Sequence, residues 1–323
     1  MLPDQKFGQC KISLYTLTKH NCIVVLGPTA SGKTHLACKL AYELSGEVIS
    51  ADSRQVYKGL DIGTGKDLQE YLVNGRQIPY HLIDIAEPGE QFYLHQFTEK
   101  LKSAFLDIRL RNQIPIICGG TGLYLDALKK DFSFTQIKEN ESLREELEFL
   151  QKEDLLTRLD RYPVEFTKQV DRNSKKRIIR GIEIAEHFSK HGKDISYMEL
   201  PYKPYYIGIA TEVEERKKHI SERLKKRLNE GLIAEVENLI SSGISHERLH
   251  LFGLEYKFVS SYLKKEITKE ELFTRLQTAI FQFAKRQMTW FRKMEKEGVE
   301  IHWVEKTNSD QIIENLRTEF DFS

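Results

Sequence analysis

Residues 22–34 read Cys-Ile-Val-Val-Leu-Gly-Pro-Thr-Ala-Ser-Gly-Lys-Thr, an apolar run that ends in a complete G-x-x-x-x-G-K-T motif. A helical pattern follows directly over residues 35–41, so the motif stands between a predicted strand and a predicted helix. Glycines let the backbone N–H groups of such a loop point at phosphate oxygens, and the helix adds the positive end of its dipole. The stretch therefore predicts a P-loop that holds a diphosphate group at the start of an α/β domain.

Four residues give this loop its expected chemistry. Gly27 and Gly32 allow the backbone to curl, and Lys33 can neutralise negative charge. The hydroxyl of Thr34 can be a ligand of Mg²⁺, so we expect Mg²⁺ as the cofactor. The motif does not identify the molecule whose phosphates it binds.

Length and composition are typical of a soluble enzyme that can carry a second, smaller domain. The chain has 323 residues, of which 40% are hydrophobic and 30% are charged. No apolar run approaches the roughly 20 residues that span a bilayer, and the first residues lack the apolar core of a secretory signal. Cys10, Cys22, Cys38 and Cys118 form no C-x-x-C pair, which indicates core packing in a reducing compartment. We therefore expect a cytoplasmic protein with no membrane partner.

Basic residues are concentrated in three places, although the net charge is only +1. They are residues 172–180, residues 216–227 and residues 285–293, the last of which also contains a tryptophan and a phenylalanine. Any one of them alone is typical of a solvated helix face. Basic and aromatic side chains together suit phosphates and unstacked bases, so the three clusters make a nucleic acid a candidate partner.

Strand and helix patterns alternate over residues 1–128, which is typical of a parallel sheet covered by helices on both faces. With the P-loop at its start, the predicted fold class is a P-loop NTPase-like α/β domain. Ligands of such sheets bind at the carboxyl ends of the strands, so the residues that follow each strand are candidates for the site. The predicted strands are 22–26, 47–50, 81–85 and 114–118, and the predicted helices are 33–44, 95–111 and 123–128.

The pattern changes at about residue 129. Residues 129–200 are charged and helical, with Leu143, Leu147 and Leu150 on one face, which predicts an inserted helical subdomain. Residues 201–323 return to the sheet through an apolar run and are then helical. Their predicted strands are 205–210 and 299–303, and their predicted apolar stripes are Ile220, Leu224 and Leu228 on one helix and Phe281, Ala284, Met288 and Phe291 on another.

A polar, glycine-rich segment at residues 50–67 directly follows the second predicted strand. Asp52 lies in it, across the expected cleft from the P-loop. Its carboxylate could be a general base, an acceptor for a Mg²⁺-bound water, or a cap and turn residue, and position alone leaves these open. A Walker B aspartate should end an apolar strand, and the only candidate, Asp84, matches weakly.

Four motifs follow one another along nearly the whole chain, at residues 27–34, 52–64, 119–124 and 285–292. They read GPTASGKT, DSRQVYKG with DIGT, GGTGLY and KRQMTWFR. In this combination the chain closely resembles the tRNA dimethylallyltransferase family. The resemblance implies a P-loop that uses no nucleotide and instead holds the diphosphate of dimethylallyl diphosphate. It also implies transfer of the prenyl group to N6 of the adenosine on the 3′ side of the anticodon in tRNA.

The resemblance implies roles for individual residues. Asp52 matches the base that takes a proton from the adenine amino group, and Lys33 acts beside it as a charge-neutralising group. Arg223, placed by the Glu-Gly-Leu sequence at residues 230–232, matches the arginine that helps neutralise the departing diphosphate. The implied diphosphate site is Gly27, Thr29, Ala30, Ser31, Gly32, Lys33 and Thr34, with Thr34 on Mg²⁺. The implied tRNA contacts are Asp52, Ser53, Arg54, Gln55, Thr121, Lys176, Arg177 and Arg180.

The resemblance also implies the partners, which are dimethylallyl diphosphate and the anticodon stem-loop of tRNA. The inserted subdomain would then bind tRNA. We expect the protein to be a monomer.

Three departures from the family pattern stand out. The chain continues Gly-Lys-Asp-Leu at residues 65–68, where the family often has a proline. Phe281 stands where an arginine is common, and Gly-Leu-Glu-Tyr-Lys at residues 253–257 replaces the usual G-Y-K/R element. We expect these changes to lie in RNA-facing or late helical parts and to affect tRNA choice more than chemistry.

Three other functions use some of the same features. A P-loop small-molecule kinase would need only the loop and ATP, but it leaves the residues after Tyr205 without a purpose. Prenyl transfer to free AMP or ADP shares the catalytic half and has less need for the insertion. A non-catalytic RNA-binding module would have no use for Lys33, Thr34 and Asp52 together. Trp290 could stack on a base or pack in the core, and the sequence favours neither.

Overall fold

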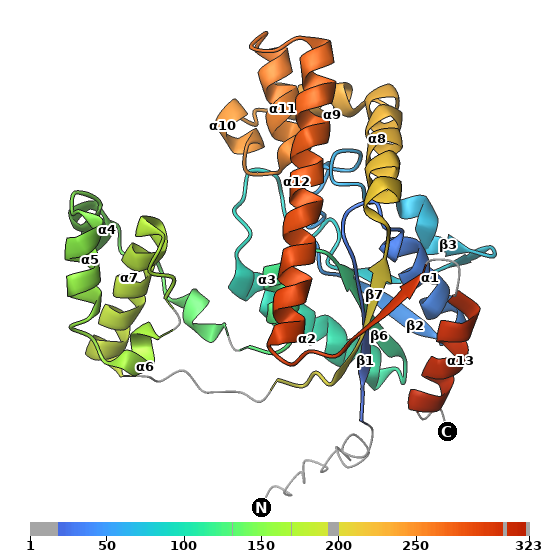
Figure 1. Cartoon of the computed structure of the whole chain (residues 1–323), viewed down its shortest axis with the longest axis horizontal. Helices are drawn as coiled ribbons and strands as arrows, with labels where there is room; N and C mark the ends of the chain where they lie inside the picture. The colour runs from blue at the N-terminus through green and yellow to red at the C-terminus, as the bar shows by residue number, and fades with distance from the viewer. Residues whose placement is uncertain (1–18, 131, 169, 193–199, 306–308, 321–323) are drawn as a thin grey trace, which may run out of the picture. The chain divides into compact units, whose positions relative to one another are not determined.

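Six parallel strands form the centre of the fold. A computed structural model describes residues 19–130, 132–168, 170–192, 200–305 and 309–320 of the chain. The strands lie side by side in the order β5-β2-β6-β1-β7-β8 (Figure 1). They are β1 (Cys22–Leu26), β2 (Gly46–Ser50), β5 (Tyr80–His81), β6 (Ile114–Gly119), β7 (Pro204–Ala210) and β8 (Ile301–Glu305).

The central strands are buried along their whole length. Every residue of β1, β2 and β6 is buried. Strands of a parallel sheet that is covered on both faces read as continuous apolar runs, which is why the sequence located these three. The carboxyl ends of β1, β2 and β6 carry the P-loop, the segment that begins at Ala51, and the Gly119–Thr121 turn.

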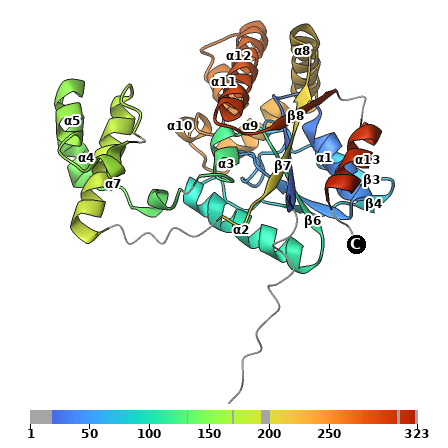
Figure 2. The ribbon, with the colours of Figure 1, turned by 60° about the horizontal axis from the view of Figure 1, so that its bottom comes forward.

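Helices cover both faces of the sheet (Figure 2). Helix α1 (Lys33–Glu43) connects β1 to β2, and α2 (Leu94–Leu110) connects β5 to β6. These two connections run in opposite directions across the sheet, so right-handed crossovers put α1 and α2 on opposite faces. Helix α13 (Ser309–Glu319) joins the face of α1, because Ile312 and Leu316 belong to the same hydrophobic cluster as the buried side of α1.

The predicted strand at 81–85 is wrong. Strand β5 ends at His81, and the next residues include Leu82 with φ 63° and Asp84 with φ 55°. Backbone in the left-handed region cannot continue a strand. The N–H of Asp84 instead donates to the carbonyl of Gln55 at 3.1 Å. The other short elements of this part of the chain are η1 (Leu68–Tyr71), β3 (Leu72–Val73), β4 (Arg76–Gln77) and α3 (Gly122–Asp126).

Helices between β7 and β8 build a second hydrophobic core. Val56, Tyr57 and Leu60, from the segment after β2, are buried in the same core. The segment after β2 is therefore held against these helices and not only against the sheet. The helices between β7 and β8, in the upper part of Figure 1, are α8 (Val213–Asn229), α9 (Leu232–Ser241), α10 (His246–Leu249), α11 (Leu254–Leu263) and α12 (Lys269–Lys296).

Helix α12 begins with a capping box in which Thr268 and Glu271 each bind the other's backbone N–H. Its predicted apolar stripe is partly wrong, because Phe281 and Met288 are only half-buried and Gln287 takes an inward position. The buried face is Leu272, Leu276, Ile280, Ala284, Gln287, Phe291 and Met294. Neither α12 nor any other helix among the described residues is long and apolar enough to cross a membrane.

The chain divides into two compact units, and the second consists of Tyr93–Thr98 with Lys130–Leu200. This second unit is helical and has its own small core, to which Leu143 and Leu147 belong and against which Leu150 packs. No pattern in the sequence indicates that residues 93–98 go with the insertion predicted at 129–200. The elements from Ser133 to His191 are η2 (Ser133–Gln136), α4 (Glu141–Glu148), α5 (Lys152–Leu159), α6 (Val164–Thr167) and α7 (Lys175–His191).

Three of the four cysteines lie in the first unit as buried free thiols, as the sequence predicts. They are Cys22, Cys38 and Cys118. Burial raises the pKa of each thiol, that of Cys118 to about 12. Cys10 lies outside the described residues.

Candidate active site

The P-loop has the backbone that its glycines predict. Gly32 caps α1 with φ 84°, in the left-handed region where glycine carries no steric penalty. A Cβ on Gly27 would lie 2.7 Å from the Oγ of Ser31, so only glycine allows this close approach. Ala30 also has a positive φ of 62°, and this backbone is unusual for a residue with a side chain. Lys33 and Thr34 then begin the helix, where its first N–H groups are unpaired within the helix.

Gln287 links the P-loop to two other parts of the first unit. Its Oε1 accepts a hydrogen bond from the N–H of Thr29 at 2.8 Å, and its Nε2 donates to the carbonyl of Gly120 at 2.9 Å. A Cβ on Gly120 would lie 2.3 Å from that Nε2. Helix α12 therefore fixes the P-loop against the turn after β6. The sequence placed Gln287 on a helix face but gave no sign of this role.

Asp52 follows β2 and faces the same cavity as the P-loop. Its Oδ1 accepts a hydrogen bond from the N–H of Arg54 at 2.9 Å, which makes it a turn residue as well as a cavity residue. The N–H of Ser53 donates to the Oγ1 of Thr121 at 3.2 Å. The turn interpretation of Asp52 is thus confirmed, because the turn holds one carboxylate oxygen, and its roles as a general base or beside Mg²⁺ stay predictions.

The cavity has a volume of about 380 Å³ and is lined from five directions. They are the P-loop, the segment after β2, the turn after β6, helix α8 and helix α12, and the start of α11 adds Leu254 and Glu255. Lys33 lies deep enough for burial to lower its pKa, an effect that the nearby Asp52 opposes. The site therefore brings a half-buried lysine and a carboxylate into one cavity.

Two arginines of α8 reach into this cavity. The Nη2 of Arg223 forms an ion pair with the Oδ2 of Asp67 at 2.6 Å. Arg227, one helical turn later, is 8% exposed and lies 3.6 Å from the Oε1 of Glu255. Burial lowers its pKa to about 10, and the neighbouring Arg223 adds to the shift, so Arg227 is still charged at neutral pH. The sequence indicated Arg223 only, although the i, i+4 spacing puts both on one helix face.

The glycine at position 65 lets both arginines approach the loop. A Cβ on Gly65 would lie 1.5 Å from the Nη2 of Arg227 and 2.2 Å from the Nη2 of Arg223. The φ of Gly65 is also positive, at 63°. Both conditions require glycine, so this departure from the family pattern has a direct consequence inside the cavity.

A single carboxylate from α9 orders the first half of this loop. Glu235 accepts hydrogen bonds from the N–H groups of Asp61 at 2.9 Å, Ile62 at 2.6 Å and Gly63 at 3.0 Å. The hydroxyl of Tyr256 donates to the same carboxylate at 2.7 Å. The carboxylate of Glu235 thereby accepts hydrogen bonds from three consecutive backbone N–H groups that would otherwise bond to water.

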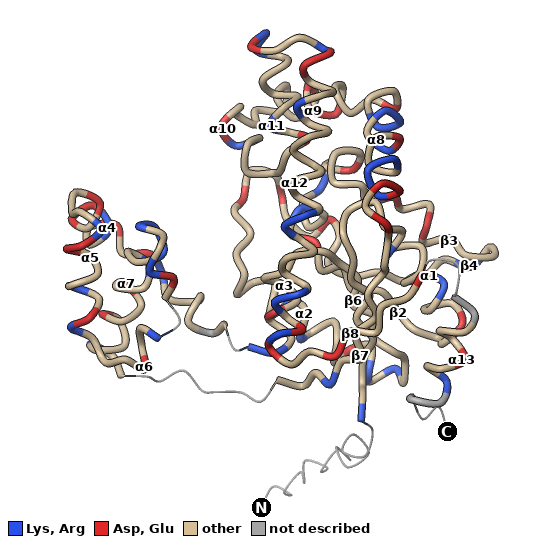
Figure 3. The backbone as a smooth tube through the Cα atoms, in the orientation of Figure 1, with Lys and Arg blue, Asp and Glu red and all other residues tan. Residues whose placement is uncertain are grey.

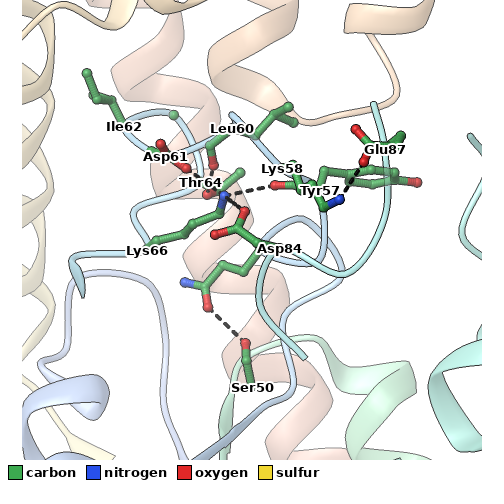
Figure 4. Close-up of polar contacts among 12 residues, drawn as sticks. Ser50, Tyr57, Lys58, Leu60, Asp61, Ile62, Thr64, Lys66, Asp84 and Glu87 are labelled. Atoms are coloured by element: carbon green, nitrogen blue, oxygen red, sulfur yellow. Dashed lines mark hydrogen bonds and ion pairs between the residues drawn. The ribbon is translucent and has the colours of Figure 1, made fainter. Parts of the chain in front are cut away.

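Lys66 anchors the loop from its other side (Figure 4). Its buried Nζ donates to the carbonyl of Tyr57 at 2.8 Å and to the Oδ1 of Asp61 at 2.6 Å, and it pairs with the carboxylate of Asp84. Asp84 is thus occupied by Lys66 and is not among the described residues that line the cavity. The weak Walker B match at Asp84 is therefore wrong, because a left-handed turn and an ion pair take the place of a strand end facing the phosphates.

The structure brings most of the predicted site residues of the first unit together and leaves four beside the cavity. Gly27, Ser31, Ser53 and Thr121 support the surrounding backbone and do not line it. The Oγ of Ser31 is buried without a hydrogen-bond partner among the described residues. The predicted residues that line the cavity are Thr29, Ala30, Gly32, Lys33, Thr34, Asp52, Arg54, Gln55 and Arg223.

The remaining predicted residues lie on α7 of the second unit. Lys176 and Arg177 are exposed, and Arg177 pairs with Asp171. Arg180 is half-buried and bonds within its own unit, donating to the carbonyl of Ile137 and pairing with Glu183 at 3.3 Å. The exposed pair is available at the surface, whereas Arg180 also stabilises the helix to which it belongs.

Two of the three departures contribute to the cavity, and residues 253–257 lie in the late helical part, as expected. Gly65 and Asp67 line the cavity, and so do Leu254 and Glu255. Gly253, with φ 126°, leaves space for Arg54, whose Nε would lie 2.5 Å from a Cβ at that position. These changes therefore shape the cavity itself.

Trp290 packs inside the first unit. Its ring atoms would lie 2.4 Å from a Cβ on Gly122, and the Nζ of Lys293 lies 5.1 Å from the ring centroid. Packing against the turn after β6 therefore accounts for part of this half-buried ring, and stacking on a base stays a prediction.

The fold and the cavity define the chain as a P-loop α/β protein in which a phosphate cradle faces an aspartate and two arginines. A family model described as IPP transferase matches residues 55–294, and one described as isopentenyl transferase matches residues 20–87. The tRNA dimethylallyltransferase 1 of Parabacteroides distasonis is 45% identical over 291 residues, which cover 90% of this chain and 94% of the relative. The tRNA dimethylallyltransferase 2 of Shewanella sediminis is 47% identical over 289 residues, covering 88% and 93%.

Solved structures agree with these matches. The tRNA isopentenylpyrophosphate transferase of Bacillus halodurans is 30% identical with a TM-score of 0.65, covering 93% of this chain and 96% of that one. A eukaryotic dimethylallyltransferase acting on tRNA is 25% identical with a TM-score of 0.73, covering 92% and 77%. The chain belongs to the IPP transferase family, the family of the tRNA dimethylallyltransferases.

Proposed function

We propose that the chain transfers the dimethylallyl group of dimethylallyl diphosphate to N6 of the adenosine on the 3′ side of the tRNA anticodon and releases diphosphate. The observation that carries the proposal is the convergence of the P-loop, Asp52 and Arg223 on one cavity in a chain of this family. In the reaction the allylic C–O bond breaks with its electron pair going to the diphosphate oxygen, the N6–C bond forms, and N6 loses a proton.

The cradle for the diphosphate is the P-loop. Negative charge develops on the diphosphate as the allylic C–O bond breaks, and preorganised donors stabilise a transition state where its charge develops. The N–H groups at the start of α1, the Lys33 ammonium and the Arg223 guanidinium can supply such donors from two sides of the cavity. The two sides belong to segments about 190 residues apart, so the helices after β7 are needed to complete the site.

Asp52 is suited to accept the proton from the adenine amino group. That amino group is a poor nucleophile, and a positioned carboxylate contributes roughly 10²- to 10⁴-fold by removing its proton. The hydrogen bond from the N–H of Arg54 fixes one oxygen of the carboxylate and leaves the group facing the cavity.

The donor set around Thr34 fits a Mg²⁺ that arrives with a diphosphate. Among the described residues no three His, Cys, Asp or Glu side chains are arranged to hold a metal ion. Mg²⁺ in phosphate sites keeps several waters and needs only one or two protein ligands. The hydroxyl of Thr34 would be such a ligand, and Asp52 lines the same cavity. When bound, the ion would neutralise charge on the leaving diphosphate.

Basic helices support tRNA as the second substrate. Lys and Arg gather along α8 and the later part of α12 in the first unit, and on α7 in the second (Figure 3). Phosphate contacts of this kind supply affinity without reading the sequence. An adenine in an anticodon loop can leave its stack at a cost of a few kcal/mol, which such contacts can offset.

Mass spectrometry of nucleosides tests the proposal. Unmodified tRNA is incubated with the protein, Mg²⁺ and dimethylallyl diphosphate, then digested, and the modified position is located in RNase fragments. We expect N6-dimethylallyladenosine next to the anticodon on its 3′ side, with one diphosphate released for each product. ATP in place of the prenyl donor should give no product. Transfer of phosphate from ATP to a small nucleotide, with tRNA unchanged, would instead establish a kinase. Prenylation of free AMP or ADP in preference to tRNA would show that the acceptor is a free nucleotide.

A further inference from the structure

Arg227 is a buried charge that its protein neighbours leave incompletely bound. Its side chain is 10% exposed. The Nη1 donates to the carbonyl of Gly63 at 3.4 Å, and the pair with the Oε1 of Glu255 is 3.6 Å long. The Nη2 has no hydrogen-bond partner among the described residues. A guanidinium group carries five N–H donors, so most of those on Arg227 have no good acceptor among the residues that the structure describes.

Arg227 itself belongs to the wall of the cavity. Arg227 lines it together with Thr29 and Lys33 of the P-loop, and with Arg223 one turn earlier on α8. A smaller recess next to the main cavity also has both arginines and Thr29 in its lining. The two guanidinium groups lie against the backbone of Gly65, where no side chain separates them.

Two like charges in one buried place repel each other, and Arg223 does lower the pKa of Arg227. Asp67 and Glu255 supply counter-charges, but the pair of Arg227 with Glu255 is too long for a good hydrogen bond. An anion with several oxygens would offer acceptors to the guanidinium groups of both arginines at once, because a guanidinium group binds phosphate oxygens in a bidentate way.

We propose that Arg227 is a second guanidinium ligand of the diphosphate, acting with Arg223 from the side of the cavity opposite the P-loop. The inference rests on the proposed function and adds a residue to that same site. In it the diphosphate lies between the P-loop cradle and the two arginines of α8. Arg227 then binds the pyrophosphate product as well as the diphosphate of the substrate.

Binding of magnesium pyrophosphate tests this directly. Isothermal titration compares the wild type with Arg227→Met, which keeps an unbranched apolar stem and removes the guanidinium group. We expect the affinity for magnesium pyrophosphate to fall about 10- to 100-fold, as for the loss of hydrogen bonds to a charged group. The kcat/KM for dimethylallyl diphosphate should fall by a similar factor, while the affinity for tRNA stays within about twofold. Arg275→Met is the control, since it removes an exposed arginine that lies outside the cavity and outside the three basic clusters.

Arg227→Lys keeps a buried cation next to Glu255 and so tests the proposal even where the methionine variant folds poorly. It should bind pyrophosphate more weakly than the wild type and more tightly than Arg227→Met. Equal pyrophosphate affinity in the wild type and both variants would overturn the inference and leave Arg227 a structural residue. A wild type that transfers no prenyl group and binds no pyrophosphate would instead overturn the proposed function, so the two failures are distinguishable.

Discussion

A methyl group at position 65 would enter the space that two guanidinium groups occupy. Gly65→Ala places its Cβ 1.5 Å from Arg227 and 2.2 Å from Arg223, at a backbone with φ 63°. We expect both arginines to move, pyrophosphate affinity to fall at least tenfold, and stability to fall by about 1 kcal/mol from the left-handed backbone. Titration with magnesium pyrophosphate and thermal unfolding measure the two effects.

Gly75→Ala is the control for that variant. Gly75 also has a positive φ, at 78°, but nothing lies within 4 Å of the position of its Cβ. It should lose a similar amount of stability and keep its pyrophosphate affinity. If Gly65→Ala binds pyrophosphate as tightly as Gly75→Ala does, the guanidinium groups are not held as the structure shows.

The buried thiols should be slow to react. Burial raises the pKa of Cys118 to about 12, above the usual range of a thiol, so the reactive thiolate is scarce at pH 8. The same holds for Cys22 and Cys38, whose pKa is also raised by burial. We expect peptides with these three residues to stay unlabelled by iodoacetamide in the native protein and to be labelled in urea. Rapid native labelling of Cys118, read by peptide mass spectrometry, would contradict its burial.

At the scale of elements, the loop at residues 61–67 depends on helix α9. Glu235→Gln keeps one oxygen acceptor but replaces the other with an NH₂ group, which cannot accept from the N–H of Gly63. We expect a loss of about 1–3 kcal/mol of stability, because a partly buried donor is left without its acceptor. Hydrogen exchange of the Asp61–Gly63 amides should become faster, and prenyl transfer should slow.

The control is Glu237→Gln, which changes an exposed glutamate of the same helix. Unchanged exchange at these amides would show that the carboxylate is dispensable.

Sequence patterns predict those elements whose cause is local. The P-loop, β1, β2, β6 and α1 follow from apolar runs, glycine positions and a helix start that lie within a few residues of each other. Strand β5 could not be predicted at its true length, because Lys66 and the carbonyl of Gln55 hold Asp84 in a turn. The apolar pattern at residues 81–85 contains no sign of those distant partners.

Within the site, the same distinction separates what was predicted from what was not. Asp52 directly follows a predicted strand, and Lys33 belongs to the P-loop motif, so the sequence alone indicates both residues. Gln287 reaches the P-loop from a position 258 residues away, and no local pattern encodes that contact. Arg227 lies in a basic helix where most side chains are solvated, and only packing against Gly65 and Glu255 shows that it is buried.

At the scale of the whole molecule, the expected tRNA contacts are divided between two units. Asp52, Arg54 and Thr121 belong to the first unit, and Lys176 and Arg177 belong to the second. Phosphate contacts and chemistry should therefore be separable by mutation, because each group of residues is held by its own core.

Lys176→Ala tests that separation. The exposed ammonium should contribute one phosphate contact, so the slope of log K for tRNA against log salt should become less negative by about 1. Pyrophosphate affinity should not change. Lys168→Ala removes an exposed lysine of the same unit that lies outside the three basic clusters, and it should leave the salt slope as it is. A slope unaffected by Lys176→Ala would remove this residue from the RNA contacts.

We expect Asp52 to take the proton from N6 while the P-loop holds the diphosphate, and single-turnover prenyl transfer by Asp52→Asn measures that step. Asparagine keeps an oxygen that can accept from the N–H of Arg54, so the turn and the affinity for magnesium pyrophosphate should be retained. The rate of N6-dimethylallyladenosine formation on saturated enzyme should fall roughly 10²- to 10⁴-fold, because the amide cannot accept the proton. A variant that binds pyrophosphate normally and transfers the prenyl group at the wild-type rate would contradict the account.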